Sequence, residues 1–156
     1  MATELAVGDR APAFQLATDE GAEISSAELK GKRYVLYFYP KDDTSGCTKE
    51  AVGFTEAARK FAAAGLTVIG VSKDSVESHA KFRKKYGLRV RLGSDPEKKT
   101  AEAYGVWIKK SLYGRSYMGM DRATFLIDGK GVIRQIWRKV KVPGHVEAVL
   151  AAAKSL

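Results

Sequence analysis

The sequence predicts an α/β fold, a central mixed β-sheet with helices on both faces. Residues 34–39 form a continuous apolar run that ends at Pro40, and residues 66–71 form a second run, as expected for strands buried on both faces. Between them, residues 51–62 place apolar side chains at helical spacing, and Gly65 supplies a stop. A strand, a helix and a strand in this order indicate a parallel strand pair.

The rest of the chain adds helices and a hairpin to this unit. A capping box, an N-cap followed by proline and a late proline predict three helices, at 74–86 with Gly87 as its stop, at 95–105, and from Pro143 onward. Strands at 122–127 and 132–137 flank Asp128-Gly129-Lys130-Gly131, which is typical of a hairpin turn. No linker or repeat divides the sequence, so we expect one domain over residues 1–156.

The 156-residue chain has a single cysteine and a formal net charge of +9. One cysteine excludes an intramolecular disulfide and any multi-cysteine metal cluster. His79 and His145 have no partners at metal-ligand spacing, so we expect no metal and treat both as ordinary polar residues. The start of the chain lacks a basic, apolar signal, and no apolar run could cross a bilayer; we therefore expect a cytoplasmic protein without membrane contact.

Positive charge is concentrated in residues 79–156, which carry a balance of +12 against −3 for residues 1–78. Nucleic-acid binding would need these charges on one face together with exposed aromatic side chains, and no recognised binding motif accompanies them. A solvated basic surface is favoured, and no specific nucleic-acid partner is expected. A third use is attraction of an acidic reductant.

The cysteine, Cys47, lies in a short polar segment after the first apolar strand. With Thr44 or Ser45 as the N-cap, it falls in the first turn of a helix, where free N–H groups and the helix dipole favour an anion such as a thiolate. The alternative is a small buried hydrophobe. The carboxylates of Asp42 and Asp43 oppose a thiolate, so a cation must face the site.

The segment Phe38-Tyr39-Pro40-Lys41-Asp42-Asp43-Thr44-Ser45-Gly46-Cys47-Thr48-Lys49-Glu50-Ala51 resembles the active-site segment of peroxiredoxins, Pro-x-x-x-Thr-x-x-Cys. It is most similar to the bacterioferritin comigratory protein (PrxQ-type) subfamily. The resemblance extends to residues 8–14, 104–107 and 122–128. It implies a thioredoxin-like fold and a peroxidase that reduces hydrogen peroxide and organic hydroperoxides, in antioxidant defence and redox homeostasis, without a cofactor.

The resemblance also assigns roles to five residues. Cys47 would be the peroxidatic nucleophile and become a sulfenic acid. Thr44 would donate a hydrogen bond to the peroxide, and Pro40 would shield the thiolate from water. Arg122 would be the missing cation and would polarise the O–O bond, with Glu50 orienting it. Taken alone, each supporting residue has a simpler interpretation: Arg122 as a surface arginine, Thr44 as an N-cap and Pro40 as the end of a strand.

The sequence departs from the subfamily where a second, resolving cysteine is expected. The two positions that relatives use hold Val52 and Arg83, and Ser45 replaces a usual proline. We therefore expect a one-cysteine variant, a monomer or weak homodimer, recycled by an external thiol from thioredoxin, glutaredoxin, glutathione or a second copy of the chain. The alternative function is a redox sensor in which oxidation of Cys47 changes a partner contact without turnover.

Overall fold

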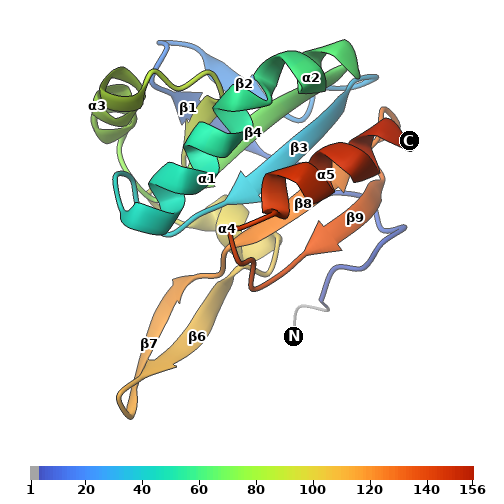
Figure 1. The fold of residues 1–156 in the computed structure, drawn as a ribbon. Coiled ribbons are helices and arrows are strands. Elements are labelled where there is room, and N and C mark those ends of the chain that lie inside the picture. Colours follow the sequence, from blue (N-terminus) through green and yellow to red (C-terminus); the bar gives the residue numbers. More distant parts are fainter. Residues whose placement is uncertain (1–3) are drawn as a thin grey trace.

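The computed structural model describes residues 4–156, so the expected start of the domain at residue 1 lies outside the described residues. Within residues 4–156, seven strands form one mixed sheet in the order β2-β1-β5-β4-β3-β8-β9, and two more form a separate ribbon (Figure 1). The strands are β1 Gln15–Thr18, β2 Glu23–Ser25, β3 Arg33–Phe38, β4 Leu66–Ser72, β5 Arg91–Ser94, β6 Trp107–Leu112, β7 Arg115–Met120, β8 Ala123–Ile127 and β9 Ile133–Trp137.

The centre of the sheet is the predicted parallel pair. Strands β3 and β4 run parallel with Arg33 opposite Leu66 and Phe38 opposite Val71, and β3 is buried along almost its whole length. On its other side β3 pairs antiparallel with β8, which continues into β9 as the predicted hairpin. These predictions are confirmed, and the carboxyl end of β3 leads directly to Pro40 and the segment that carries Cys47.

Helices cover both faces of the sheet, as predicted. The helices are α1 Ser45–Glu56, α2 Ala58–Ala63, α3 Val76–Tyr86, α4 Lys99–Ala103 and α5 His145–Lys154. Helices α1, α2 and α5 lie across one face and α4 lies behind the other (Figure 1). Each face buries its own apolar cluster: one includes Phe38 and Tyr104, and the other includes Tyr37, Cys47 and Phe54.

The helix starts differ from the predictions for local reasons. Ser75, not Asp74, caps α3, because its hydroxyl accepts from the N–H of Ser78. The turn that begins at Asp95 precedes α4, so that helix starts only at Lys99. Helix α5 starts at His145 after Gly144, which has the positive φ of 77° that glycine adopts easily.

The predicted helix over residues 51–62 is interrupted. Its backbone turns at Ala57, between α1 and α2, where the Ala57 N–H reaches back to Gly53 and Thr55. Gly65 and Gly87 stop α2 and α3 as predicted, and Gly87 takes the left-handed conformation with its N–H bonded to the Arg83 carbonyl. A single apolar stripe therefore predicted the helical residues but not the bend between them.

Several strands were not predicted from the sequence. Strands β1, β2 and β5 are only three or four residues long, too short to show a clear apolar pattern. The β6–β7 hairpin lacks such a pattern because most of its side chains are exposed. The hairpin projects from the body of the molecule (Figure 1). In the part of the chain that the structure describes, none of the helices has the length and apolar character needed to span a membrane.

Candidate active site

Cys47 occupies the first turn of α1, as predicted from its N-cap. Thr44 is the N-cap, its carbonyl accepts the N–H of Thr48 at 2.8 Å, and the helix begins at Ser45. The thiol is 1% exposed and belongs to the apolar cluster beneath α1. Cys47 is therefore both a buried residue and a helix-start residue, and its polar contacts decide between the two interpretations.

One guanidinium reaches the sulfur. Arg122, which immediately precedes β8, directs Nη2 to Cys47 Sγ at 3.4 Å and donates from Nη1 to Glu50 Oε1 at 2.8 Å. Its side chain remains 18% exposed, so the cation lies between the buried thiol and solvent. The interpretation of Arg122 as a free surface arginine is wrong, and the structure supplies the cation that the site requires.

Glu50 holds the other side of this guanidinium. It lies one helical turn after Cys47 and is 0% exposed. Burial raises the pKa of Glu50 to about 7, although the charge and hydrogen bond of Arg122 oppose this shift. Within residues 4–156, its second oxygen, Oε2, is buried without a hydrogen-bond partner. The Glu50–Arg122 pair can therefore change its charge near neutral pH.

His145 adds a buried neutral group behind Glu50. Its Nε2 lies 2.8 Å from Thr124 Oγ1 and 4.0 Å from Glu50 Oε2. Burial, together with the positive charge of Arg122, lowers the pKa of His145 to about 4, so the imidazole is neutral at pH 7. The prediction of His145 as an ordinary polar residue missed these contacts, because Thr124 lies on a strand 21 residues away and could not be found from spacing.

Thr44 and Pro40 frame the same turn without touching the ion pair through a hydrogen bond. The Thr44 hydroxyl donates to the Lys41 carbonyl at 2.9 Å and makes no side-chain cap bond. The simple side-chain N-cap interpretation is therefore incomplete, since Thr44 is the N-cap by backbone geometry only. Pro40 is half-buried and lines a surface pocket together with Arg122.

Gly46 adjoins the Arg122 guanidinium, and the sequence did not predict this contact. A Cβ atom placed on Gly46 would lie 3.1 Å from Arg122 Nη2, closer than most real contacts of this kind. The absence of a side chain therefore lets the guanidinium lie against the first turn of α1. A glycine inside the first turn of a helix, directly before Cys47, was the available signal.

The two carboxylates expected to oppose a thiolate have other partners. Asp42 is buried and accepts from Tyr39 at 2.5 Å and Ser78 at 2.8 Å, and its Oδ2 lies 2.7 Å from His79 Nδ1. Asp43 accepts from Lys85 at 2.8 Å and also from Tyr86. Helix α3 therefore holds both carboxylates, and this reduces their opposition to a negative charge on the sulfur.

His79 is the centre of this second network. It is 0% exposed, with Nε2 3.0 Å from the Gly93 carbonyl in addition to the Asp42 contact. Burial alone would lower the pKa of His79, but the hydrogen bond and charge of Asp42 outweigh burial and raise it. A positively charged His79 can donate from both nitrogens, so it ties α3 to the segment before Cys47. Its assignment as an ordinary polar residue is wrong.

The two positions expected for a resolving cysteine have structural contacts. Val52 packs against the apolar cluster beneath α1. Arg83 donates to both oxygens of Asp19, at 2.6 and 3.1 Å, and to the carbonyls of Leu88 and Val90, each at 2.8 Å. Arg83 therefore fixes the end of α3 against the sheet and contributes no redox chemistry.

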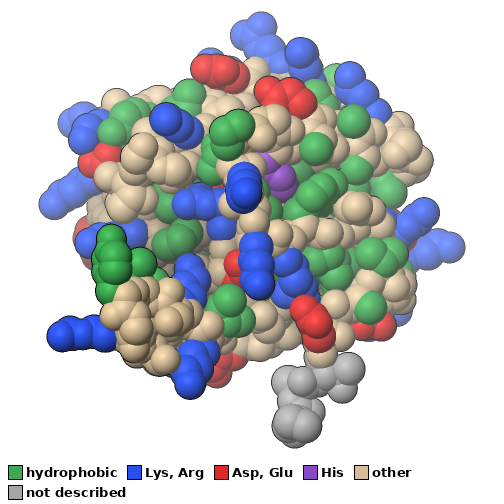
Figure 2. All heavy atoms as spheres, turned by 60° about the horizontal axis from the view of Figure 1, so that its bottom comes forward, with side chains coloured by type: hydrophobic (Ala, Val, Ile, Leu, Met, Phe, Trp, Pro, Cys, Tyr) green, Lys and Arg blue, Asp and Glu red, His purple; other side chains and the backbone are tan. Residues whose placement is uncertain are grey.

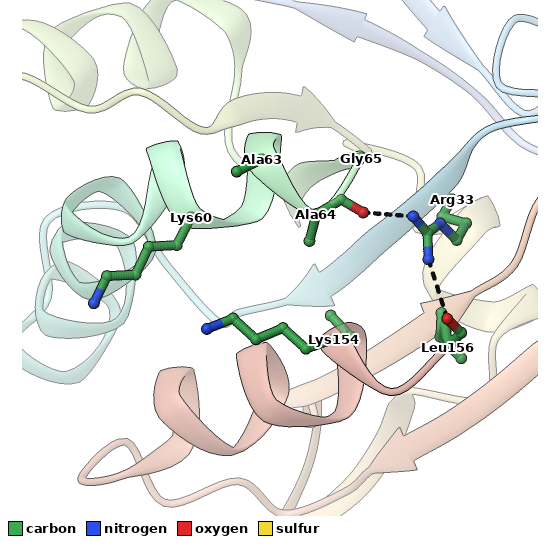
Figure 3. Close-up of a pocket in the computed structure, with 8 residues that line it drawn as sticks. Arg33, Lys60, Ala63, Ala64, Gly65, Lys154 and Leu156 are labelled. Carbon is green, nitrogen blue, oxygen red and sulfur yellow. Dashed lines mark hydrogen bonds between the residues drawn. The ribbon is translucent and has the colours of Figure 1, made fainter.

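A separate hollow lies at the opposite end of β3, between α2 and α5 (Figure 3). Lys60 and Lys154 line it, and Arg33 donates to the Ala64 carbonyl at 2.6 Å beside the C-terminal Leu156. None of the predicted site residues lines this pocket, so it is separate from the Cys47 site.

The chain is similar over most of its length to known proteins. Residues 7–136 match the model of the AhpC/TSA family. The chain is 52% identical over 144 residues to a putative peroxiredoxin bcp of Coxiella burnetii, covering 92% of this chain and 95% of that protein. It is 46% identical over 150 residues to peroxiredoxin Bcp of Bacillus subtilis, covering 96% of each.

A solved structure of the Xanthomonas campestris bacterioferritin comigratory protein, described for its alkyl peroxide reduction activity, is similar over most of its length. It superimposes with a TM-score of 0.87 at 41% identity, covering 91% of this chain and 90% of that one.

Proposed function

Because this chain belongs to the AhpC/TSA family and is a peroxiredoxin, an antioxidant peroxidase that works through a thiol, we propose that Cys47 is the thiol that reacts with peroxide. The thioredoxin-like peroxiredoxin fold and the peroxidase activity that the sequence resemblance implied are confirmed. The observation that carries the assignment of Cys47 is the 3.4 Å contact between its sulfur and the guanidinium of Arg122.

In the first step, the Cys47 thiolate attacks the terminal oxygen of the hydroperoxide. An S–O bond forms as the O–O bond breaks, and the electron pair leaves on an alkoxide or hydroxide that takes up a proton to become an alcohol or water. Arg122 stabilises the thiolate before attack and the charge on the leaving oxygen during it, because its charge is fixed and its donors lie at the sulfur.

Three further residues shape this step. Glu50 holds Nη1 of Arg122, so that Nη2 stays directed at the sulfur. The Thr44 hydroxyl donates to the Lys41 carbonyl, which leaves its oxygen free to accept a hydrogen bond from the peroxide O–H. This reverses the donor role that the sequence suggested for Thr44. Pro40 has no N–H to compete for the substrate and shields the thiolate from water.

The second half of the cycle needs a thiol from outside the chain, because Cys47 is the only cysteine in the sequence. We propose that thioredoxin, glutaredoxin or glutathione supplies it, in a cytoplasmic protein that is a monomer or weak homodimer. The alkyl peroxide activity described for the Xanthomonas campestris relative suggests that organic hydroperoxides are substrates here as well as hydrogen peroxide.

The test is peroxide consumption by the full chain, with dithiothreitol, glutathione and a thioredoxin system supplied in parallel. We expect many turnovers per Cys47 with at least one reductant and none in a Cys47→Ser variant. A single stoichiometric oxidation that none of the three reductants reverses would instead favour the redox-sensor function, in which Cys47 oxidation is the end of the reaction.

A further inference from the structure

A pocket of about 500 Å³ opens beside the reactive thiol, at the base of the β6–β7 hairpin. Pro40 and Arg122 form part of its wall, and Lys109, Lys110 and Lys139 line it. Because Arg122 Nη2 lies 3.4 Å from Cys47 Sγ, a molecule in this pocket is separated from the sulfur by little more than one guanidinium. The volume is in the range that suits a small ligand.

The pocket is strongly cationic. Within residues 4–156, none of the three lysines forms a salt bridge, and Asp121 is the one acidic side chain among the lining residues. The Arg122 charge is partly compensated by Glu50. Figure 2, which turns the bottom of Figure 1 forward, shows Lys and Arg side chains gathered across the middle of this face. Three uncompensated ammonium groups next to the site favour a ligand with negative charge.

The lysines are held near the site by the backbone around them. The Val140 N–H donates to the Arg122 carbonyl at 2.9 Å, which attaches the neighbouring Lys139 to the strand end that carries Arg122. Lys110 is half-buried, and its stem lies against Gly119 on the facing strand, where a Cβ would meet it at 3.2 Å. The backbone of Lys139 is therefore held beside Arg122, and the stem of Lys110 has a defined position at the pocket.

We propose that this pocket binds a low-molecular-weight thiol bearing carboxylates, of which glutathione is an example, and positions it to reduce oxidised Cys47. The inference rests on the proposed function and names its reductant. Hydrogen peroxide is neutral, so three lysines would not attract it. The reductant must come from outside the chain, and an anionic reductant would be attracted. The lysines would act mainly by raising the rate at which an anionic thiol arrives.

The structure favours a small thiol over a folded protein reductant. Cys47 is 1% exposed, so a protein thiol would require the turn around it to open. The His79–Asp42 contact at 2.7 Å and the paired Asp43 side chain oppose such opening, because they tie the preceding segment to α3. A small thiol has less of the chain to displace, because the pocket already reaches Arg122, which contacts the sulfur.

The chemistry balances with two thiols. The first attacks the Cys47 sulfenic sulfur, an S–S bond forms, the S–O bond breaks and water leaves with the thiol proton. The second attacks the mixed disulfide and releases the Cys47 thiolate. The two small thiols leave joined as a disulfide, so together they supply the two electrons that reduce Cys47. Arg122 stabilises the departing hydroxide in the first attack and the thiolate in the second.

The experiment compares thiols of different charge on a Lys110→Glu/Lys139→Glu double variant. Cys47 is first oxidised with hydrogen peroxide, and the decay of its sulfenic acid is followed by dimedone trapping and mass spectrometry. We expect the rate constant for glutathione to fall about tenfold relative to the parent chain, that for neutral dithiothreitol to change less than about twofold, and that for cationic cysteamine to rise. Comparing variant with parent for each thiol cancels differences in intrinsic nucleophilicity.

A Lys60→Glu/Lys154→Glu variant is the matched control, because it changes the same charge in the distant hollow of Figure 3. It should leave the glutathione rate within about twofold of the parent. Equal changes for all three thiols, or an equal loss in the control variant, would overturn the assignment of the pocket. Failure of peroxide to form the sulfenic acid in the parent chain would instead contradict the proposed function, so the two failures are distinguishable.

Discussion

Two arginines of this protein have the same kind of partner and opposite uses. Arg122 donates to Glu50 and directs its remaining terminal nitrogen at Cys47. Arg83 donates to Asp19 from two nitrogens and gives its other bonds to two backbone carbonyls, so each of its three nitrogens has an acceptor inside the structure. An ion pair alone therefore does not distinguish the two arginines; the donor that Arg122 directs at the Cys47 sulfur does.

Of the changes predicted here, loss of the Arg122 side chain should slow the reaction with peroxide most. An Arg122→Ala variant should react with hydrogen peroxide about 10²–10³-fold more slowly, because the sulfur and the leaving oxygen lose their cation. The measurement is the second-order rate constant for Cys47 oxidation, with Arg83→Ala as the reciprocal control that should stay within about twofold.

A Gly46→Ala variant should lower the same rate constant more mildly by displacing Arg122. It should not weaken α1, because alanine is a better helix former than glycine.

The next effect concerns stability and Arg83. An Arg83→Ala variant should lower the free energy of unfolding by about 2 kcal/mol, because Asp19, whose side chain is 3% exposed, is left without its cation. Denaturant titration measures this, and Lys84→Ala, an exposed neighbour on the same helix, is the control expected to change stability by less than about 0.5 kcal/mol. A large rate loss with unchanged stability in Arg83→Ala would reverse the roles given to the two arginines.

The smallest predicted effect is a pH dependence that comes from Glu50, the carboxylate bonded to Arg122. Glu50 has a raised pKa, about 7, so the folded protein binds its proton more tightly than the unfolded chain does. The stability of the parent should therefore fall relative to that of Glu50→Gln as the pH rises from about 4.5 through 7. In the same range the peroxide rate of the parent should rise a few-fold as the carboxylate ionises and holds Arg122, and Glu50→Gln should lack this inflection.

The control for this pH dependence is Glu56→Gln, an exposed position later in the same helix. It should keep both the rate inflection and the stability profile of the parent, since Glu50 and its contact with Arg122 are unchanged. If Glu50→Gln and Glu56→Gln show the same profiles, Glu50 does not orient Arg122.

Local pattern was enough for the parts of the fold that have strong apolar runs. The parallel β3–β4 pair, the β8–β9 hairpin and the stop glycines Gly65 and Gly87 follow from patterns within a few residues. The β6–β7 hairpin could not be predicted in this way, because its side chains are mostly exposed and show no buried face. That unpredicted hairpin contributes two of the three lysines proposed to bind the reductant.

Local sequence was enough to propose Cys47 as the nucleophile and to predict its position. One cysteine in the first turn of a helix after a buried strand depends only on neighbouring residues, so Cys47 could be identified without the structure. The tertiary structure decided what surrounds it. The Arg122–Glu50 contact joins residues 72 apart, and His79 reaches Asp42 across 37. Such contacts depend on the order in which strands pair and on which helix covers which face, and these are global properties that no local pattern encodes.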